Sequence, residues 1–167
     1  MTATDTAPGA PAPAWLTALT VILATLATAF LGAAVSAGSR DAWYSALDKP
    51  AGTPPDIAFA IVWPVLYALM AIGAIIVAVR GGGWWKSSGA LGLFFAQLIP
   101  NLGWSVAFFG FRQPELSMVI LVALWLMVLA MIIAFARHSW LAALLQLPYF
   151  GWVIFAGYLN AGIIWLN

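Results

Sequence analysis

The 167-residue sequence contains no cysteine and a single histidine, His138. Without thiols, the chain cannot form a disulfide, a cysteine-bound zinc site, an iron–sulfur cluster or a cysteine nucleophile. Without a second histidine, it cannot supply a paired-histidine haem or metal site. We therefore expect no metal site and no required cofactor, and none of these chemistries defines the function.

Charge is also scarce. Only 7% of residues are charged, where about 25% is usual, and the net charge of +1 offers nucleic acid no electrostatic footprint. The apolar residues make up 65% of the chain. A soluble fold of this size still exposes roughly 30% of its chain surface, so most of this chain must be surrounded by lipid. The composition predicts a multi-pass integral membrane protein whose partner is the bilayer, with no nucleic acid as partner.

Charged and turn residues divide the sequence into five apolar blocks without the period-2 alternation of a barrel strand. Each is long enough to cross a bilayer core, which takes about 20 helical residues. We predict an all-α fold, a bundle of five transmembrane helices with the two termini on opposite sides. We expect a disordered tail over 1–14, then a single domain over 15–167 with spans at about 15–38, 57–80, 89–111, 116–137 and 140–166.

The segment 39–56 is the only long connection between the predicted spans. It carries the cations Arg40 and Lys49 beside the aromatic pair Trp43 and Tyr44. Long loops in compact domains are usually functional or disordered, and the aromatic pair favours packing. We therefore predict a lid over one mouth of the bundle. The Lys and Arg residues divide three against three between the two sides, so the positive-inside rule leaves the orientation open.

No Asp, Glu or Lys lies inside a predicted span. Because ionisable groups within the membrane mark proton relays and ion paths, their absence argues against a proton-coupled pump and excludes a retinal Schiff base. Neutral polar and aromatic residues recur instead at helical spacing, as in Trp63 and Tyr67, or Gln97 and Asn101. Each of these residues, taken singly, is explained by hydrogen bonding between helices. The whole set equally fits an aromatic pocket for a small molecule.

Four segments carry a resemblance to a known family. They are WYSALDKPAGTPP, VWPVLYALM, QLIPNLGWSVAFFG and LLQLPYFGWVIFAGYLN, in this order between Trp43 and Asn160. Together they resemble the TspO/MBR family of tryptophan-rich sensory proteins and translocator proteins (peripheral benzodiazepine receptors). The resemblance implies five helices, a homodimer, and binding of porphyrins such as protoporphyrin IX or of sterol-like molecules.

The resemblance also implies a function and the residues that surround the ligand. The implied function is tetrapyrrole sensing, regulation or transport. Alternatives are a porphyrin or sterol transporter, or an enzyme that degrades porphyrin in light with Trp63 or Trp152 as redox partner. Arg40 and Lys49 would meet the propionates at the mouth. The implied ligand-binding residues are Tyr44, Trp63, Tyr67, Asn101, Trp104, Ser105, Tyr149, Trp152, Ala156 and Asn160.

The sequence departs from the family pattern at Gly52, Ile57 and Ile61, all in or next to the lid. Gly52 stands where the family usually has Trp, so we expect a looser lid that Gly52→Trp would tighten. For the homodimer, one candidate face holds Gly103 and Ala107, because small residues let helices approach closely. The resemblance places the protein in a bacterial cell membrane, or in the mitochondrial outer membrane if the chain is eukaryotic.

Overall fold

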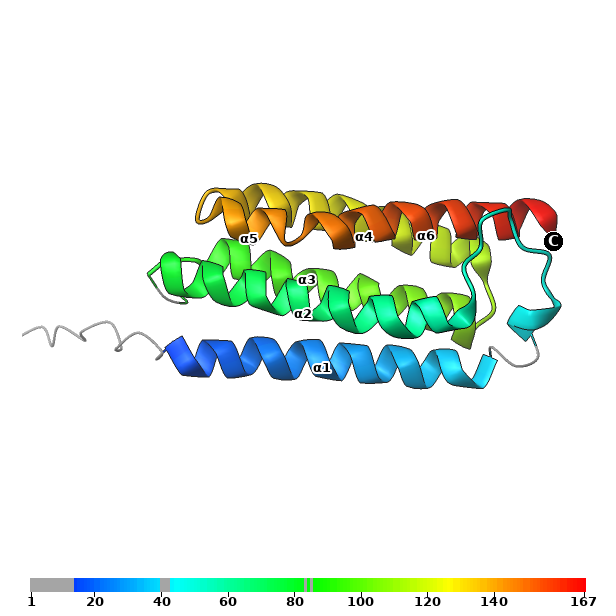
Figure 1. Cartoon of the computed structure of the whole chain (residues 1–167), viewed down its shortest axis with the longest axis horizontal. Helices are drawn as coiled ribbons and strands as arrows, with labels where there is room; N and C mark the ends of the chain where they lie inside the picture. The colour runs from blue at the N-terminus through cyan, green and yellow to red at the C-terminus, as the bar shows by residue number, and fades with distance from the viewer. Residues whose placement is uncertain (1–13, 40–42, 83, 85) are drawn as a thin grey trace, which may run out of the picture.

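The computed structural model describes residues 14–39, 43–82, 84 and 86–167 (Figure 1). Residues 1–13, which make up nearly all of the expected tail, and Arg40 lie outside the described residues. Helices dominate the described part, and it contains no β-strand. The elements are α1 Ala14–Ser39, α2 Asp56–Arg80, α3 Ser88–Ser105, the π-helical turn η2 Val106–Gly110, α4 Pro114–Ala136, α5 Trp140–Leu144 and α6 Leu147–Leu166.

Five stretches of the described chain are long and apolar enough to cross a membrane, which confirms the predicted fold class. The shortest has 23 residues, and at about 1.5 Å per residue this exceeds a hydrocarbon core of about 30 Å. The fifth stretch, Trp140–Leu166, contains both α5 and α6. Residue 14 and the C-terminus lie at opposite ends of the bundle (Figure 1).

The helix starts follow from local chemistry. Pro114 and Pro148 occupy the first turns of α4 and α6, where a missing backbone N–H costs nothing. The Ser139 hydroxyl caps α5 by accepting a hydrogen bond from the Ala142 backbone N–H at 3.4 Å. Near the other end of the bundle, α3 widens into η2, and such π-helical turns often occur at functional sites.

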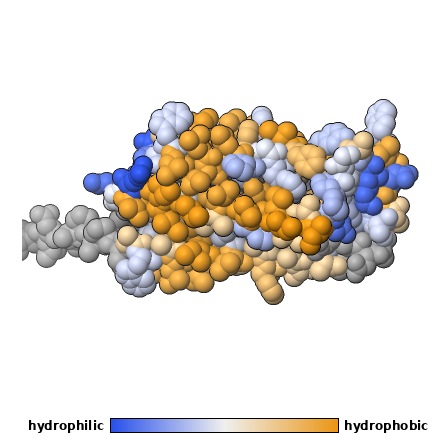
Figure 2. Space-filling model, in the orientation of Figure 1, coloured by the Kyte–Doolittle hydropathy of each residue, from blue (hydrophilic) through white to orange (hydrophobic). Residues whose placement is uncertain are grey.

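The outer surface and the interior of the bundle are both apolar, but they differ in how closely their side chains pack. Large apolar side chains such as Phe30, Ile99 and Val119 are 74%, 75% and 68% exposed, and orange apolar atoms cover most of the visible face (Figure 2). Inside, side chains near the α2–α3 connection are fully buried, including Val77, Leu91 and Phe135. Lipid-facing and interior surfaces are therefore both apolar, and only their packing distinguishes them.

Candidate ligand cavity

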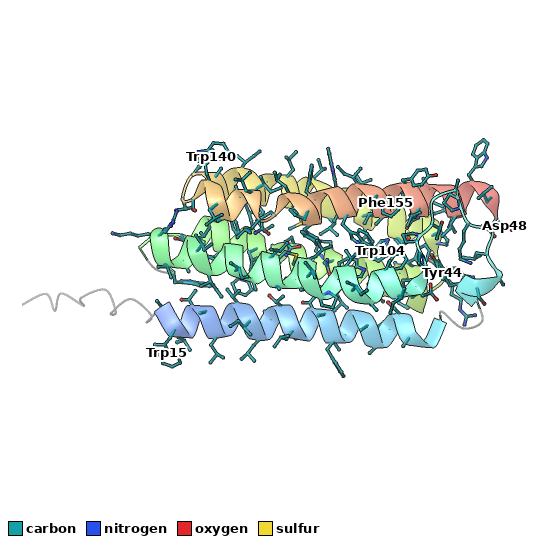
Figure 3. The ribbon with its side chains drawn as sticks, viewed as in Figure 1. Trp15, Tyr44, Asp48, Trp104, Trp140 and Phe155 are labelled. Carbon is teal, nitrogen blue, oxygen red and sulfur yellow. The ribbon has the colours of Figure 1, made fainter. Side chains whose placement is uncertain are left out.

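A cavity of about 790 Å³ lies mainly in the half of the bundle next to the lid, and it extends past the middle of α1 and α2 to Ile22 and Ile75. Its wall comes from α1, α2, α3, η2 and α6, and Tyr44 contributes to it from the lid. Figure 3 shows Tyr44, Trp104 and Phe155 in this half of the bundle. Of the residues that the sequence proposed for ligand binding, the structure brings these into one wall: Tyr44, Trp63, Tyr67, Trp104, Ser105, Trp152, Ala156 and Asn160.

Trp63 is the centre of the aromatic wall. Its ring lies 6.4 Å from Trp104 in a stacked arrangement and 6.5 Å from Trp152 edge-on, measured between ring centroids. Tyr67, one turn along α2, is 5.5 Å away. Three indoles from α2, α3 and α6 thus meet although they lie far apart in the sequence. Offset and edge-on pairs of this kind add about 0.5–1.5 kcal/mol each beyond burial.

The lid rests on the end of the aromatic cluster. A short helical turn at 43–46 presents Tyr44, which is 8% exposed and packs against Phe108 and Phe109 at centroid distances of 6.1 and 5.6 Å. Burial, and secondarily the Asp56 carboxylate, raise the pKa of the Tyr44 phenol above its usual value. The buried ring of Tyr44 forms part of the cavity wall at the lid end.

Contacts along α6 fasten the rest of the lid. The Asn167 side-chain amide pairs with the Asp48 backbone, accepting from its N–H at 3.1 Å and donating to its carbonyl at 3.0 Å. The Tyr158 hydroxyl donates to the Ala51 carbonyl at 2.8 Å. A β-carbon added to Gly162 would lie only 2.5 Å from Pro50. α6 and Asn167 therefore contact the lid at Asp48, Pro50 and Ala51.

Asn101 and Tyr149, two further predicted site residues, lie behind the wall. Their side chains form a chain of hydrogen bonds in which Tyr67 donates to Asn101 at 2.7 Å, Asn101 to Tyr149 at 2.7 Å, and Tyr149 to Gln97 at 2.9 Å. Asn101 and Tyr149 are only 2% and 0% exposed. They are buried because their polar groups satisfy one another, and they hold Tyr67 in position at the cavity surface.

Asn160 lies in the wall, but its polar atoms are engaged within the protein. Its Oδ1 accepts from Trp104 Nε1 at 3.2 Å and from the Ser117 hydroxyl at 2.6 Å, and its Nδ2 donates to the Pro114 carbonyl at 2.8 Å. This amide therefore joins α6 to α3 and to the first turn of α4. Its direct effect on the site is to fix the indole of Trp104.

The charged residues of the site are placed unevenly. Lys49 is absent from the cavity wall: its Nζ donates to the carbonyls of Ser45 and Leu47 at 3.5 and 3.3 Å and lies 4.8 Å from the centre of the Tyr44 ring. Among the described wall residues, the only charged side chain is Asp56. The described residues contain no group of three or more His, Cys, Asp or Glu that could hold a metal ion.

Sequence reasoning missed several wall residues. Phe59 precedes Trp63 by one turn, Phe108 follows Trp104 by one turn, and Phe155 follows Trp152 by three residues, so helical spacing alone could have found them. Two small residues of α1, Ala29 and Gly32, also line the cavity. Ile57 and Ile61, by contrast, are 65% and 61% exposed and absent from the wall.

Five apolar helices, four of which surround an aromatic cavity, define a multi-pass helical membrane protein with an intrabundle pocket. The sequence profile of the TspO/MBR family matches residues 14–166, and the chain belongs to this family.

Relatives of this chain come from several branches of life. It is 42% identical to the tryptophan-rich protein TspO of Chlorobaculum tepidum over 144 residues, 85% of this chain and 90% of that one. It is 40% identical to the tryptophan-rich protein TspO of Archaeoglobus fulgidus, over 87% of this chain and 94% of that one. It is 37% identical to the translocator protein of Bos taurus, covering 89% of each. Each of these matches covers at least 85% of this chain.

Proposed function

We propose that the cavity binds a flat hydrophobic tetrapyrrole, a porphyrin resembling protoporphyrin IX, and that the protein acts in tetrapyrrole sensing, regulation or transport. The observation that carries this proposal is the meeting of Trp63, Trp104 and Trp152 in one wall. The volume of about 790 Å³ falls within the range of about 300–1,000 Å³ typical of small-molecule pockets. A rigid planar ring system suits a wall built from indoles.

The binding energy would come mainly from the ring faces. Each buried Å² of apolar surface contributes about 25 cal/mol, and stacking on an indole adds about 0.5–1.5 kcal/mol. Propionates would point toward the lid, where Lys49 is the described cation, while Asp56 at the wall opposes them. Arg40 remains a prediction from the sequence. Sterol-like molecules are the second ligand class, since they bury similar apolar area without needing a cation.

The wall favours metal-free porphyrin over haem. Its described residues include no His, Cys or Met, and its two tyrosines are poor iron ligands, because Tyr67 donates its proton to Asn101 and burial raises the pKa of Tyr44. Titration of the purified protein with free-base porphyrin should therefore quench tryptophan fluorescence at lower concentration than titration with haem. Equal affinities would contradict the preference for the metal-free ring, and no quenching by either compound would overturn the porphyrin proposal.

Two alternatives use the same cavity. In the first, bound porphyrin is oxidised in light by dissolved dioxygen, which accepts the electrons, and the contacts of Trp63 with Trp104 and Trp152 favour redox participation by these indoles. A new pigment that forms only under illumination, and disappears in a Trp63→Phe, Trp152→Phe variant, would support turnover. In the second, the protein transports porphyrin or sterol, and protein-dependent flux into liposomes would support it. Binding without pigment or flux supports sensing.

We also propose a homodimer in a bacterial cell membrane. An apolar groove of about 600 Å³ lies along α1, α3 and α4, and Gly103 and Ala107 are among its residues. Ala107 is only 2% exposed, so Gly103 is the better probe. Gly103→Leu should lower the dimer mass in detergent, and an unchanged mass in a folded variant would exclude this face. Bacterial and archaeal relatives support the choice of membrane.

A further inference from the structure

The two ends of the bundle carry different charge. At the end where α1 begins, the α2–α3 and α4–α5 connections bear the cations Arg80, Lys86 and Arg137, and the sequence places no Asp or Glu between 80 and 88 or between 136 and 140. At the lid end, the described cations Lys49 and Arg112 face an excess of acids, namely Asp48, Asp56 and Glu115. Among the described residues, only the first end is uniformly basic.

The cations of the first end form one surface because the two connections touch. Arg80 Nη1 donates to the Ser139 hydroxyl at 3.1 Å, which joins the end of α2 to the start of α5. A β-carbon placed on Gly81 would lie 3.0 Å from His138 Nδ1, and one on Gly82 would lie 3.0 Å from Lys86 Cδ. We call Arg80, Lys86, Arg137 and His138 the basic surface.

The side chains of the basic surface are open to the surroundings. Arg80, Lys86 and Arg137 are exposed, and His138 is half-buried. No hydrogen bond of the described structure engages the charged groups of Lys86 or Arg137. These two cations are therefore available to an external anion, whereas Arg80 is partly engaged by Ser139.

Tryptophans place this surface at the depth of lipid headgroups. Trp15 and Trp140 are 67% and 73% exposed and point outward at the same end of the bundle (Figure 3). Exposed indoles at helix ends mark the membrane–water interface. The long side chains of Lys and Arg reach from this level to the lipid phosphates. The cations and the phosphates thus share one layer.

We propose that the basic surface binds the headgroups of anionic phospholipids, and that it does so independently of the ligand cavity. Clusters of Lys and Arg at the edge of a membrane attract anionic lipids, and the attraction fades within a Debye length. The lid end, with its excess of acids, does not share this property. The anion recognised is a phosphodiester held in a bilayer, so free phosphate competes poorly.

The test compares lipid retention by variants of the two ends. The protein is purified in a mild detergent with equal amounts of phosphatidylglycerol and phosphatidylcholine, and the lipids that stay bound are counted by native mass spectrometry. Wild-type protein should retain several-fold more phosphatidylglycerol. The variant Lys86→Gln, Arg137→Gln should lose most of this preference, whereas the matched control Lys49→Gln, Arg112→Gln should keep it. Millimolar inorganic phosphate should leave the preference unchanged.

Other outcomes would overturn the proposal. These are equal retention of both lipids by the wild type, the same loss of the phosphatidylglycerol preference in both double variants, or displacement of phosphatidylglycerol by inorganic phosphate. Should Lys86→Gln, Arg137→Gln fail to fold, the wild type alone provides the test: about 1 M NaCl, where the Debye length is about 3 Å, should abolish the preference. A preference that persists at this salt concentration would refute the role of the cations. Porphyrin titration of the same samples reports the cavity separately.

Discussion

The two halves of the bundle are filled differently. Near the α2–α3 connection, Val77, Leu91 and Phe135 are fully buried and pack into a continuous core. Near the lid, Trp63 and Trp104 surround a cavity of about 790 Å³. Close packing stabilises a fold, and an empty volume sacrifices dispersion contacts. The closely packed half therefore stabilises the bundle, while the half near the lid leaves an aromatic surface open to the cavity.

This division predicts the largest loss of stability in the packed half. Phe135→Ala should lower the free energy of unfolding by about 3–5 kcal/mol, since the fully buried ring leaves a cavity that its neighbours cannot fill. Unfolding in detergent measures this loss, with the lipid-facing Phe30→Ala as control. Porphyrin affinity of the folded fraction should stay at the wild-type value. A loss of affinity without a loss of stability would reverse the assignment of the two halves.

The next largest effect concerns the hydrogen-bond chain between the halves. Tyr149→Phe removes the hydroxyl that accepts from Asn101 and donates to Gln97, leaving two buried polar groups without this partner. The expected cost is about 1–3 kcal/mol of unfolding free energy. Tyr158→Phe, which deletes an exposed bond to the lid, should cost less. Equal losses of unfolding free energy in the two variants would show that the buried hydrogen-bond chain stabilises the fold no more than the exposed bond does.

A smaller effect distinguishes two accounts of Gly52. The sequence predicts that Gly52→Trp tightens the lid. The backbone predicts the opposite, because Gly52 has a φ of +82° in the turn closed by Thr53 N–H and the Pro50 carbonyl. A side chain in this left-handed region costs about 1–2 kcal/mol. Gly52→Trp and Gly52→Ala should therefore both speed porphyrin dissociation. Slower dissociation in Gly52→Trp alone would favour the missing indole as the cause.

The smallest effect is expected at the fastening of the lid. Asn167→Ala removes the paired bonds to the Asp48 backbone. Because both bonds are exposed to water, together they contribute about 0.5–1.5 kcal/mol, the value of one typical hydrogen bond. Porphyrin should therefore dissociate roughly two- to tenfold faster, with little change in unfolding free energy. Stopped-flow fluorescence measures the rate, and the neighbouring Leu166→Ala is the control. Identical rates in the two variants would show that the lid is held by its other contacts.

The fold could be predicted from the composition and from the length of the apolar blocks, because a chain that crosses a bilayer needs long apolar helices. The one-turn spacing of Trp63 and Tyr67, and of Trp152 and Ala156, placed each pair on one helix face, while only the resemblance suggested that these faces converge. Spacing could not separate the wall from the layer behind it. Asn101 and Tyr149 differ from Tyr67 only in depth, which depends on how the helices rotate against one another.

The remaining differences also have physical causes. Asn160 lies in the cavity wall, and its contact with a ligand stays a prediction. Its amide is also satisfied by partners from other helices, here Trp104, Ser117 and Pro114, which the sequence does not reveal as neighbours. The basic surface likewise depends on two connections that meet only in the folded chain. Properties of one helix can be predicted from its sequence; those shared between helices need the structure.

The central claim, a flat ligand bound against the indoles of the hollow half, is tested most directly at Ala156. This residue is 9% exposed and lines the cavity, so Ala156→Phe would fill space needed by the ligand. Ala161→Phe places the same ring on an exposed position of α6 outside the cavity wall. The measurement is the dissociation constant of free-base porphyrin for both variants, taken from the quenching of tryptophan fluorescence. The account predicts affinity about tenfold weaker for Ala156→Phe, equivalent to about 1.4 kcal/mol, and wild-type affinity for Ala161→Phe. Wild-type affinity in a folded Ala156→Phe protein would contradict it.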